Sequence, residues 1–383
     1  MNSFDYCNPV RIVFGEGEIA RLSDLIPKGS KIMITSGGGS IFKNGIWDQV
    51  KSALAGYDIV EFKGIEPNPQ YSTLMKAVDL AKKEKIDFLL AVGGGSVLDG
   101  TKFISVAAKY QGEDPWDIVE KGAKVNEAIP LGSVITLPAT GSEMNCLAVV
   151  SRKEQEKKLP FGNPLIFPKF SIIDPAVTFS LPERQVSNGI VDTFVHVMEQ
   201  YMTHPVNTPL QDRQAEGLIL ALMEEAAKLK ADPNDYQVRA NIFWMATWAL
   251  NGWLNVGNVQ CWATHMIGHE LTAQTGTDHG RTLALVLPAL WNHKRKEKGD
   301  KLVQFGQRVF GITGSDRDSI VDQTIAATKA FFASVGIVPS RKEYGITDEI
   351  CRKVAKYIGD RGKLGDLKNI GEKEVYEILQ LCD

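Results

Sequence analysis

The chain has 383 residues, of which 44% are hydrophobic and 23% charged, a balance typical of an ordinary globular protein with two domains. Its formal net charge of -3 favours neither nucleic acid nor an anionic membrane surface as a partner. The five cysteines are scattered without a CxxC pair, the N-terminus is unlike a signal peptide, and no apolar run reaches about 18 residues. We therefore expect a cytoplasmic protein whose partners are small molecules and further copies of the chain.

Short apolar runs alternate with helical patterns through residues 1–180. Strands are expected at Lys31–Ser36, Asp58–Phe62, 87–92 and 133–137. Helices are expected at 46–55, at 71–85 and after Ser96, where apolar residues recur with the spacing of one helix face. This alternation predicts a mostly parallel, Rossmann-like sheet with helices on both faces.

Beyond about residue 182 the patterns are almost exclusively helical, at 183–204, 209–230 and 234–273 among others. The expected boundary therefore lies near residue 180. Residues 1–180 are expected to form a dinucleotide-binding α/β domain, and residues 181–383 an all-helical, metal-binding domain.

Two glycine-rich loops follow predicted strands. In the loop at 93–96, Gly94, Gly95 and Ser96 lie between a buried strand and a helix, where backbone N–H groups and a helix N-terminus can hold a phosphate. The competing interpretation is a plain tight turn, because the fingerprint GxGxxG is absent.

The second loop consists of Gly37, Gly38, Gly39 and Ser40. An acidic residue at this place selects NAD by accepting from the ribose 2′-hydroxyl. The loop contains no carboxylate, which favours NADP(H), unless an acidic side chain reaches the ribose from elsewhere in the fold.

Candidate metal ligands cluster in the second half. Asp192 and His196 are four residues apart, as are His265 and His269, and His279 follows after a short loop. Residues with this spacing share one face of a helix, and imidazoles with one carboxylate suit Fe(II) or Zn(II). A single histidine on an apolar helix face is more often a packed core residue, so the pairs carry the hypothesis. A zinc peptidase is disfavoured because no glutamate lies between the paired histidines.

The segments FGEG, GGGSVLDGTK and LPATGSEMN, the pair Asp174-Pro175 and the pattern DxxxH…HxxxH…H occur in this order. Together they resemble the iron-containing (group III) alcohol dehydrogenases over essentially the whole chain. The loop at 37–40 and the segment NGIVDTFVHVMEQY look like the NADPH-dependent butanol dehydrogenase and broad aldehyde reductase branch.

The resemblance implies roles for individual residues. It makes the metal ligands Asp192, His196, His265 and His279. His269 would face the substrate and relay a proton, and it is a catalytic candidate together with Asp99. Contacts to the cofactor would come from the two glycine-rich loops and from a group lining the nicotinamide and its ribose: Asp99, Thr136, Ser142 and Lys158, with Lys157 as the alternative to Lys158. Residues 10–14 resemble an N-terminal strand that pairs across a homodimer interface.

The expected reaction is reversible hydride transfer between the nicotinamide and a small primary alcohol or aldehyde, with the metal as a Lewis acid. One alternative is a metal-dependent lyase of the dehydroquinate synthase type, which needs several basic residues beside the ligands, whereas only Arg281 lies near them in sequence. Others are an NAD-linked polyol oxidoreductase resembling glycerol dehydrogenase, and a nucleotide-binding regulatory subunit with a structural metal.

Overall fold

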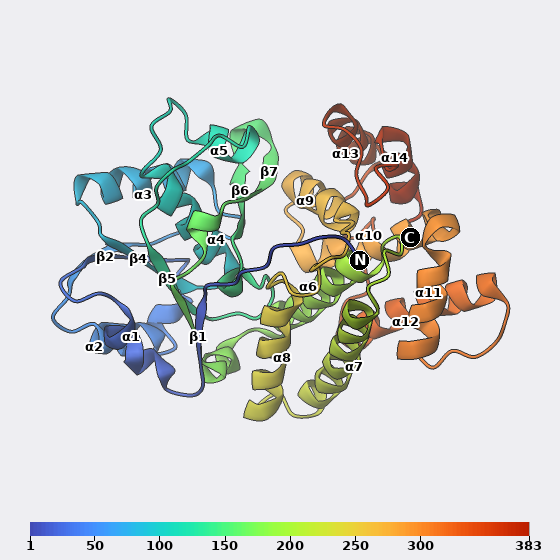
Figure 1. Ribbon diagram of the computed structural model, residues 1–383, viewed down its shortest axis with the longest axis horizontal. Helices are drawn as coiled ribbons and strands as arrows, with labels where there is room; N and C mark the ends of the chain where they lie inside the picture. The colour runs from blue at the N-terminus through green and yellow to red at the C-terminus, as the bar shows by residue number, and fades with distance from the viewer. Residues whose placement is uncertain (383) are drawn as a thin grey trace. The chain divides into compact units, whose positions relative to one another are not determined.

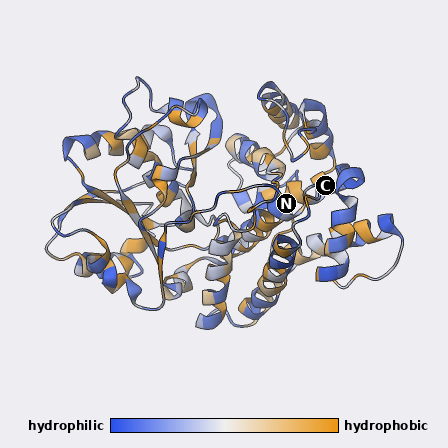
Figure 2. Cartoon of the chain, viewed as in Figure 1, coloured by the Kyte–Doolittle hydropathy of each residue, from blue (hydrophilic) through white to orange (hydrophobic). Residues whose placement is uncertain are grey.

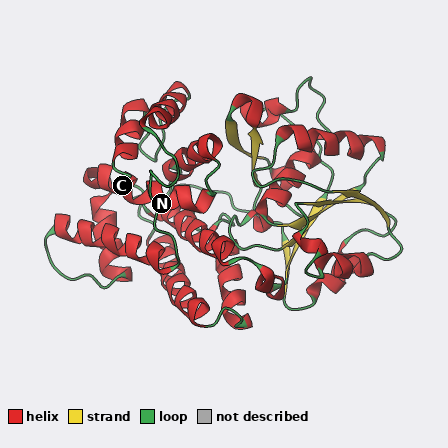
Figure 3. Ribbon diagram, turned by 180° about the vertical axis from the view of Figure 1, so that it is seen from behind, coloured by secondary structure: helices red, strands yellow, loops and turns green. Residues whose placement is uncertain are grey.

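Residues 1–382 are described by a computed structural model (Figure 1). They form two compact units. The α/β unit contains Cys7–Pro182 and Asn234–Thr247, and the helical unit contains Met1–Tyr6, Glu183–Pro233 and the chain from Trp248 onward. The strands all belong to the α/β unit (Figure 3). Among the described residues no helix combines the length and apolarity that crossing a membrane requires.

A six-stranded sheet forms the centre of the α/β unit. Its strands are β1 (Arg11–Phe14), β2 (Lys31–Ser36), β3 (Asp58–Phe62), β4 (Phe88–Gly93), β5 (Leu131–Ile135) and β8 (Phe170–Ile173). They are ordered β1-β8-β5-β4-β2-β3, and each neighbouring pair is parallel. The predicted parallel sheet is confirmed. The strands β4, β5 and β8 are buried along their whole length, which explains their continuous apolar sequences.

Helices cover both faces of this sheet. They are α1 (Leu22–Leu25), α2 (Ile46–Ala53), α3 (Tyr71–Lys83), α4 (Gly95–Ala107) and α5 (Trp116–Glu120). Leu74 and Phe103, from α3 and α4, pack in one apolar core with Leu89, whereas Val50 from α2 packs in a second core with Leu90. Because Leu89 and Leu90 are consecutive, the two cores lie on opposite faces of the sheet. Figure 2 shows hydrophobic residues, in orange, on the strands and on parts of the helices of this unit.

An antiparallel hairpin of β6 (Leu147–Arg152) and β7 (Lys157–Gly162) was not predicted. Its turn contains Glu156 at φ 51°, and its run of charged residues obscures the alternation of apolar and polar residues that is typical of strands.

Short 3-10 helices connect the elements: η1 (Glu18–Arg21), η2 (Ser40–Phe42), η3 (Ser142–Met144), η4 (Lys153–Gln155), η5 (Pro164–Ile166) and η6 (Pro175–Ser180).

The remaining elements are helices. They are α6 (Glu183–Tyr201), α7 (Pro209–Ala231), α8 (Tyr236–Ala249), α9 (Ala263–Thr275), α10 (His279–His293), α11 (Arg295–Val309), α12 (Arg317–Ser334), α13 (Asp348–Asp360) and α14 (Glu372–Gln380). In the helical unit, the long and largely buried helix α6 packs against α7, α9 and α10.

The prediction of one helical segment over 234–273 is wrong. Helix α8 ends at Ala249 and α9 begins at Ala263. Between them Gly252, Gly257 and Trp262 have φ values of 90°, 68° and 57°, and such left-handed backbone cannot continue a right-handed helix.

Residues 234–247 were expected in the helical domain, but they pack with the α/β unit. Phe243 is fully buried in an apolar core of that unit. Thr247 Oγ1 donates to Glu143 Oε1 over 2.6 Å, and Arg239 Nη1 donates to the carbonyl of Thr178 over 2.7 Å. The chain therefore returns to the α/β unit after α7, which sequence continuity alone does not indicate.

Candidate metal centre and cofactor loops

Helix α6 carries the first two predicted ligands. Asp192 and His196 are 5% and 4% exposed. Their spacing of four residues places both on one helix face, and Nε2 of His196 lies 3.6 Å from Oδ1 of Asp192.

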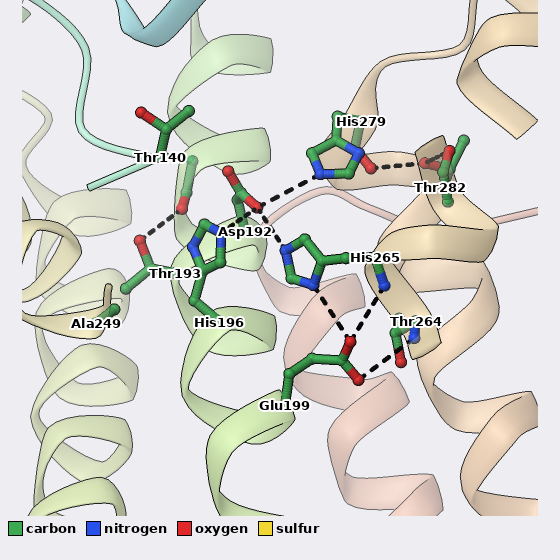
Figure 4. A network of polar contacts seen from close by, with 12 residues as sticks. Thr140, Asp192, Thr193, His196, Glu199, Ala249, Thr264, His265, His279 and Thr282 are labelled. Carbon is green, nitrogen blue, oxygen red and sulfur yellow. Dashed lines mark hydrogen bonds and ion pairs between the residues drawn. The ribbon is translucent and has the colours of Figure 1, made fainter. Parts of the chain in front are cut away.

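Two further imidazoles converge on the same carboxylate (Figure 4). Nε2 of His265, from α9, lies 3.6 Å from Asp192 Oδ1, and Nε2 of His279, the first residue of α10, lies 4.0 Å from it. Asp192, His265 and His279 each offer a ligand atom within 4.8 Å of the other two. Three imidazoles from three helices are thus gathered around one carboxylate oxygen.

This arrangement fits a divalent cation. Two ligand atoms bound tetrahedrally at about 2.1 Å from one ion lie about 3.4 Å apart, close to the observed separations of 3.6 Å between Asp192 and both His196 and His265. The donors are imidazole nitrogens and a carboxylate oxygen, which suit Fe(II) and Zn(II) equally well.

Glu199 was missed by the sequence analysis. Its Oε2 lies 3.5 Å from Nδ1 of His265 and accepts the backbone N–H of the same residue over 3.2 Å, while its Oε1 accepts from Thr264 N over 3.3 Å. Burial lowers the pKa of His265, but Asp192 and Glu199 outweigh it and raise this pKa above its ordinary value. The sequence offers one signal for this residue: Glu199 follows His196 by three residues, so helix periodicity places both on the same face of α6.

His269 lies one turn beyond His265 on α9 and is 6% exposed. Its ring centroid is 4.6 Å from that of His279 and 6.2 Å from that of His265. The structure therefore brings the predicted proton relay to the ligand cluster.

The loop after β4 leads into α4 at the predicted phosphate position. Gly94 is the N-cap and Gly95 the first helical residue. A Cβ on Gly95 would lie 2.4 Å from Thr140 Oγ1, so close packing already requires glycine there. The backbone N–H of Thr136 donates to the carbonyl of Gly93 over 3.0 Å, and Ser96 Oγ accepts from the backbone over 3.3 Å.

The loop at 37–40 follows β2, the parallel neighbour of β4, and so lies at the same edge of the sheet. A Cβ on Gly37 would lie 3.3 Å from the carbonyl of Ile65, whereas one on Gly38 would meet no atom within 4 Å. Gly39 has φ +111° and Ser40, which begins η2, is exposed. Gly38 and Ser40 thus provide the open side of the loop.

Asp99 and Ser142 are brought together as predicted neighbours. Ser142 Oγ donates to Asp99 Oδ1 over 2.7 Å, and the backbone N–H of Val149 donates to Oδ2 over 2.9 Å. Burial raises the pKa of Asp99, and the nearby ammonium of Lys102 opposes this rise. Through its two carboxylate oxygens, Asp99 therefore holds η3 and β6 to α4.

The structure distinguishes the two adjacent lysines of β7. Lys157, whose side chain is 25% exposed, pairs with Glu120 at the end of α5. Lys158 is 5% exposed, and its charge acts on Asp99. Of the two, Lys158 is the one placed beside the other predicted nicotinamide contacts.

Comparison with known families decides the classification. The family described as iron-containing alcohol dehydrogenase matches residues 9–175, and its C-terminal counterpart, the Fe-containing alcohol dehydrogenase family, matches residues 186–382. The chain belongs to the iron-containing alcohol dehydrogenases. The family resemblance inferred from the sequence is confirmed.

Individual members of this family resemble the chain along its length. The NADPH-dependent aldehyde reductase YqhD of Escherichia coli (strain K12) is 50% identical, with 98% of this chain and 99% of the relative covered. A probable NADH-dependent butanol dehydrogenase of Bacillus subtilis (strain 168) is 42% identical, with 99% of both covered. The crystal structure of YqhD superimposes with a TM-score of 0.98 at 48% identity, covering 100% of this chain and 99% of the other.

Proposed function

We propose that this iron-containing alcohol dehydrogenase is a metal-dependent, NADP(H)-linked enzyme that interconverts small primary alcohols and aldehydes. The observation that carries the proposal is the convergence of His196, His265 and His279 on Asp192. We assign these four residues as the ligands of one divalent cation, Fe(II) with Zn(II) as the alternative.

A cation held here would supply Lewis acidity toward the substrate oxygen, and the nicotinamide would supply the hydride. The chain's own residues provide the rest of the machinery. Asp192 contributes the one negative charge among the ligands, which leaves the centre electrophilic. His269, beside His279, is proposed to pass a proton from a ring nitrogen to the developing alkoxide, since imidazole commonly exchanges protons near neutral pH.

The cofactor is proposed to be held at the edge of the sheet where β2 and β4 end. Gly94, Gly95 and Ser96 would hold the pyrophosphate at the N-terminus of α4. The relatives differ in their cofactor, because YqhD is an NADPH-dependent enzyme and the Bacillus subtilis relative is a probable NADH-dependent one. We favour NADP(H) because the open positions Gly38 and Ser40 carry no carboxylate that would repel a 2′-phosphate.

The lyase alternative is not favoured. It requires basic side chains beside the metal ligands for a carboxylated substrate. Arg281, the basic residue nearest to them in sequence, lies 3.8 Å from Asp278 Oδ2, which also accepts from Arg184 over 2.6 Å. A charged substrate would compete with these ion pairs, whereas a small neutral aldehyde needs no such group.

Depletion and reconstitution of the metal test the proposal. Chelator-treated enzyme is assayed with small aldehydes and NADPH or NADH, before and after addition of Fe(II), Zn(II) or Mn(II). We expect turnover only after metal addition, with a higher kcat/KM for NADPH. Full turnover by metal-free enzyme, or no turnover with any metal, would refute the metal-dependent reductase.

We further propose a cytoplasmic homodimer. All five cysteines are free thiols, as suits a reducing compartment. Strand β1 lies at one edge of the sheet, and an edge strand can pair with the same strand of a second copy of the chain. Light scattering of the purified protein measures the oligomeric state, and a monomeric mass at micromolar concentration would contradict this part.

A further inference from the structure

Helix α9 begins without a cap of its own. Its N-cap residue, Trp262, has φ 57° and makes no side-chain hydrogen bond to the helix. The first turn of a helix leaves backbone N–H groups without partners in the helix. Two of them, from Thr264 and His265, donate to the carboxylate of Glu199 on α6, so α9 is capped by a neighbouring helix.

The same carboxylate faces the ring of His265. Glu199 Oε2 is 3.5 Å from Nδ1, while Nε2 on the other side of the ring is 3.6 Å from Asp192 Oδ1. Figure 4 shows the imidazole between the two carboxylates. The 3.5 Å contact to Nδ1, like the 3.6 Å contact to Nε2, is longer than a good hydrogen bond. A carboxylate facing Nδ1 nevertheless favours the tautomer with its proton there, which keeps the lone pair of Nε2 free for a metal.

Glu199 is fixed and its charge is compensated. It is 2% exposed, and a buried carboxylate needs both hydrogen bonds and a counter-charge. The backbone donors supply the first. Lys298, itself 6% exposed, contributes to the second: it pairs with Asp366 over 3.0 Å, and its positive charge also acts on Glu199.

We infer that Glu199 is a positioning residue for the metal centre: it caps α9 and, through Nδ1, fixes the ring orientation and tautomer of His265. It binds neither the metal nor the substrate. Because one carboxylate both caps α9 and orients the His265 ring, the position of the helix start and the orientation of the ring depend on the same residue. This inference rests on the proposed metal site.

The variant Glu199→Gln tests it. An amide has nearly the same volume but offers one acceptor, so its NH₂ group must face either the backbone N–H of Thr264 or the ring of His265. We expect folded protein whose metal affinity, measured by chelator competition on apoprotein, is roughly 10- to 100-fold weaker. The absorption spectrum of the Co(II)-loaded variant should also differ from that of the wild type.

Glu216→Gln is the matched control. Glu216 is 3% exposed and lies on α7, where it accepts from Tyr201 and from Arg308, each over 2.9 Å. Removal of the negative charge of Glu216 should destabilise the helical unit without changing metal affinity or the Co(II) spectrum. If both variants weaken metal binding equally, the effect is general destabilisation and the inference is wrong.

A measurement on the wild type does not depend on how the variants fold. In Zn(II)-loaded protein with ¹⁵N-labelled histidine, the resonances of His265, assigned with a His265→Gln sample, should show a proton on Nδ1. A protonated Nε2, or unchanged metal affinity in Glu199→Gln, overturns the role of Glu199. Wild-type protein that binds no metal at all would instead refute the proposed function.

Discussion

Nε2 of His265 on α9 and Oδ1 of Asp192 on α6 lie 3.6 Å apart in the buried interior of the helical unit. At this separation the two atoms are too far apart for a good hydrogen bond, yet they are close to the distance between two ligands of one ion. The separation therefore supports the proposal that both side chains are ligands of one cation.

His265→Ala should abolish both metal retention and aldehyde reduction. A Lewis acid contributes several kcal/mol to charge stabilisation in the transition state, so kcat/KM should fall by about a thousandfold or more. Elemental analysis of protein purified without chelator measures the metal, and circular dichroism checks the fold. His293→Ala is the control, because His293 pairs with the half-exposed Glu377 away from the ligand cluster; it should keep metal and activity. A metal-loaded, active His265→Ala enzyme would exclude this ligand assignment.

Much of the fold could be predicted because its signals are local. Strands β2 and β3 occur at the residues expected, since short apolar runs between glycine-rich or charged segments leave few alternatives. The pairs of residues four apart on α6 and α9 likewise required only helix periodicity. Their convergence on one point depended on the family resemblance, because periodicity does not say which helices are neighbours.

What could not be predicted depends on contacts between distant segments. Glu199 is indistinguishable in sequence from a solvated helix residue until α9 is known to begin opposite it. The break between α8 and α9 depends on three residues with left-handed backbone, of which Trp262 carries no such signal. The return of residues 234–247 to the α/β unit follows from the packing of Phe243, and an apolar helix face does not specify its partner.

Gly38→Asp should shift the cofactor preference from NADPH toward NADH. The substitution is compatible with the backbone, because a Cβ on Gly38 meets no atom within 4 Å and its φ lies outside the left-handed region. The new carboxylate should repel the 2′-phosphate and accept from a ribose hydroxyl. We expect the NADPH/NADH ratio of kcat/KM to fall by about tenfold or more, equivalent to about 1.4 kcal/mol. The isosteric Gly38→Asn should change the ratio much less, and equal effects of the two variants would argue against electrostatic discrimination at this loop.

Lys102→Met should destabilise the α/β unit and weaken cofactor binding. Lys102 Nζ is buried and donates to the carbonyls of Ser142, Asn145 and Leu147 over 2.7 to 2.8 Å. Loss of a buried charge that compensates Asp99 costs about 3–5 kcal/mol, to be measured by denaturant unfolding. The KM for NADPH should rise because Ser142 loses its anchor. Lys109→Met, an exposed change just beyond the end of α4, should alter neither quantity; wild-type stability in Lys102→Met would show that the carbonyls find other donors.

Asp366→Asn should destabilise the helical unit in a pH-dependent way. Lys298 Nζ donates to Asp366 Oδ1 over 3.0 Å, and the backbone N–H of His204 donates to Oδ2 over 2.7 Å. Burial acts to raise the pKa of Asp366, but Lys298 and His204 outweigh it and hold this pKa below the ordinary value of 3.8. The ionised form is therefore the one that stabilises the fold: its contribution is complete above the ordinary pKa and is lost as the pH falls through the lower, folded-state pKa.

At pH 7 the variant leaves Lys298 buried without its charged partner, so unfolding should require about 3–5 kcal/mol less than in the wild type. Urea unfolding of both proteins at successively lower pH should show this difference shrinking below the ordinary pKa of 3.8, because wild-type Asp366 then becomes protonated as well. Glu297→Gln is the control. Glu297 lies on α11, next to Lys298, and its carboxylate is 32% exposed and 3.9 Å from Lys294. Its replacement should lower the free energy of unfolding by no more than about 1 kcal/mol at any pH. A difference for Asp366→Asn that stays constant with pH would mean that the charge of Asp366 is not what stabilises this part of the fold.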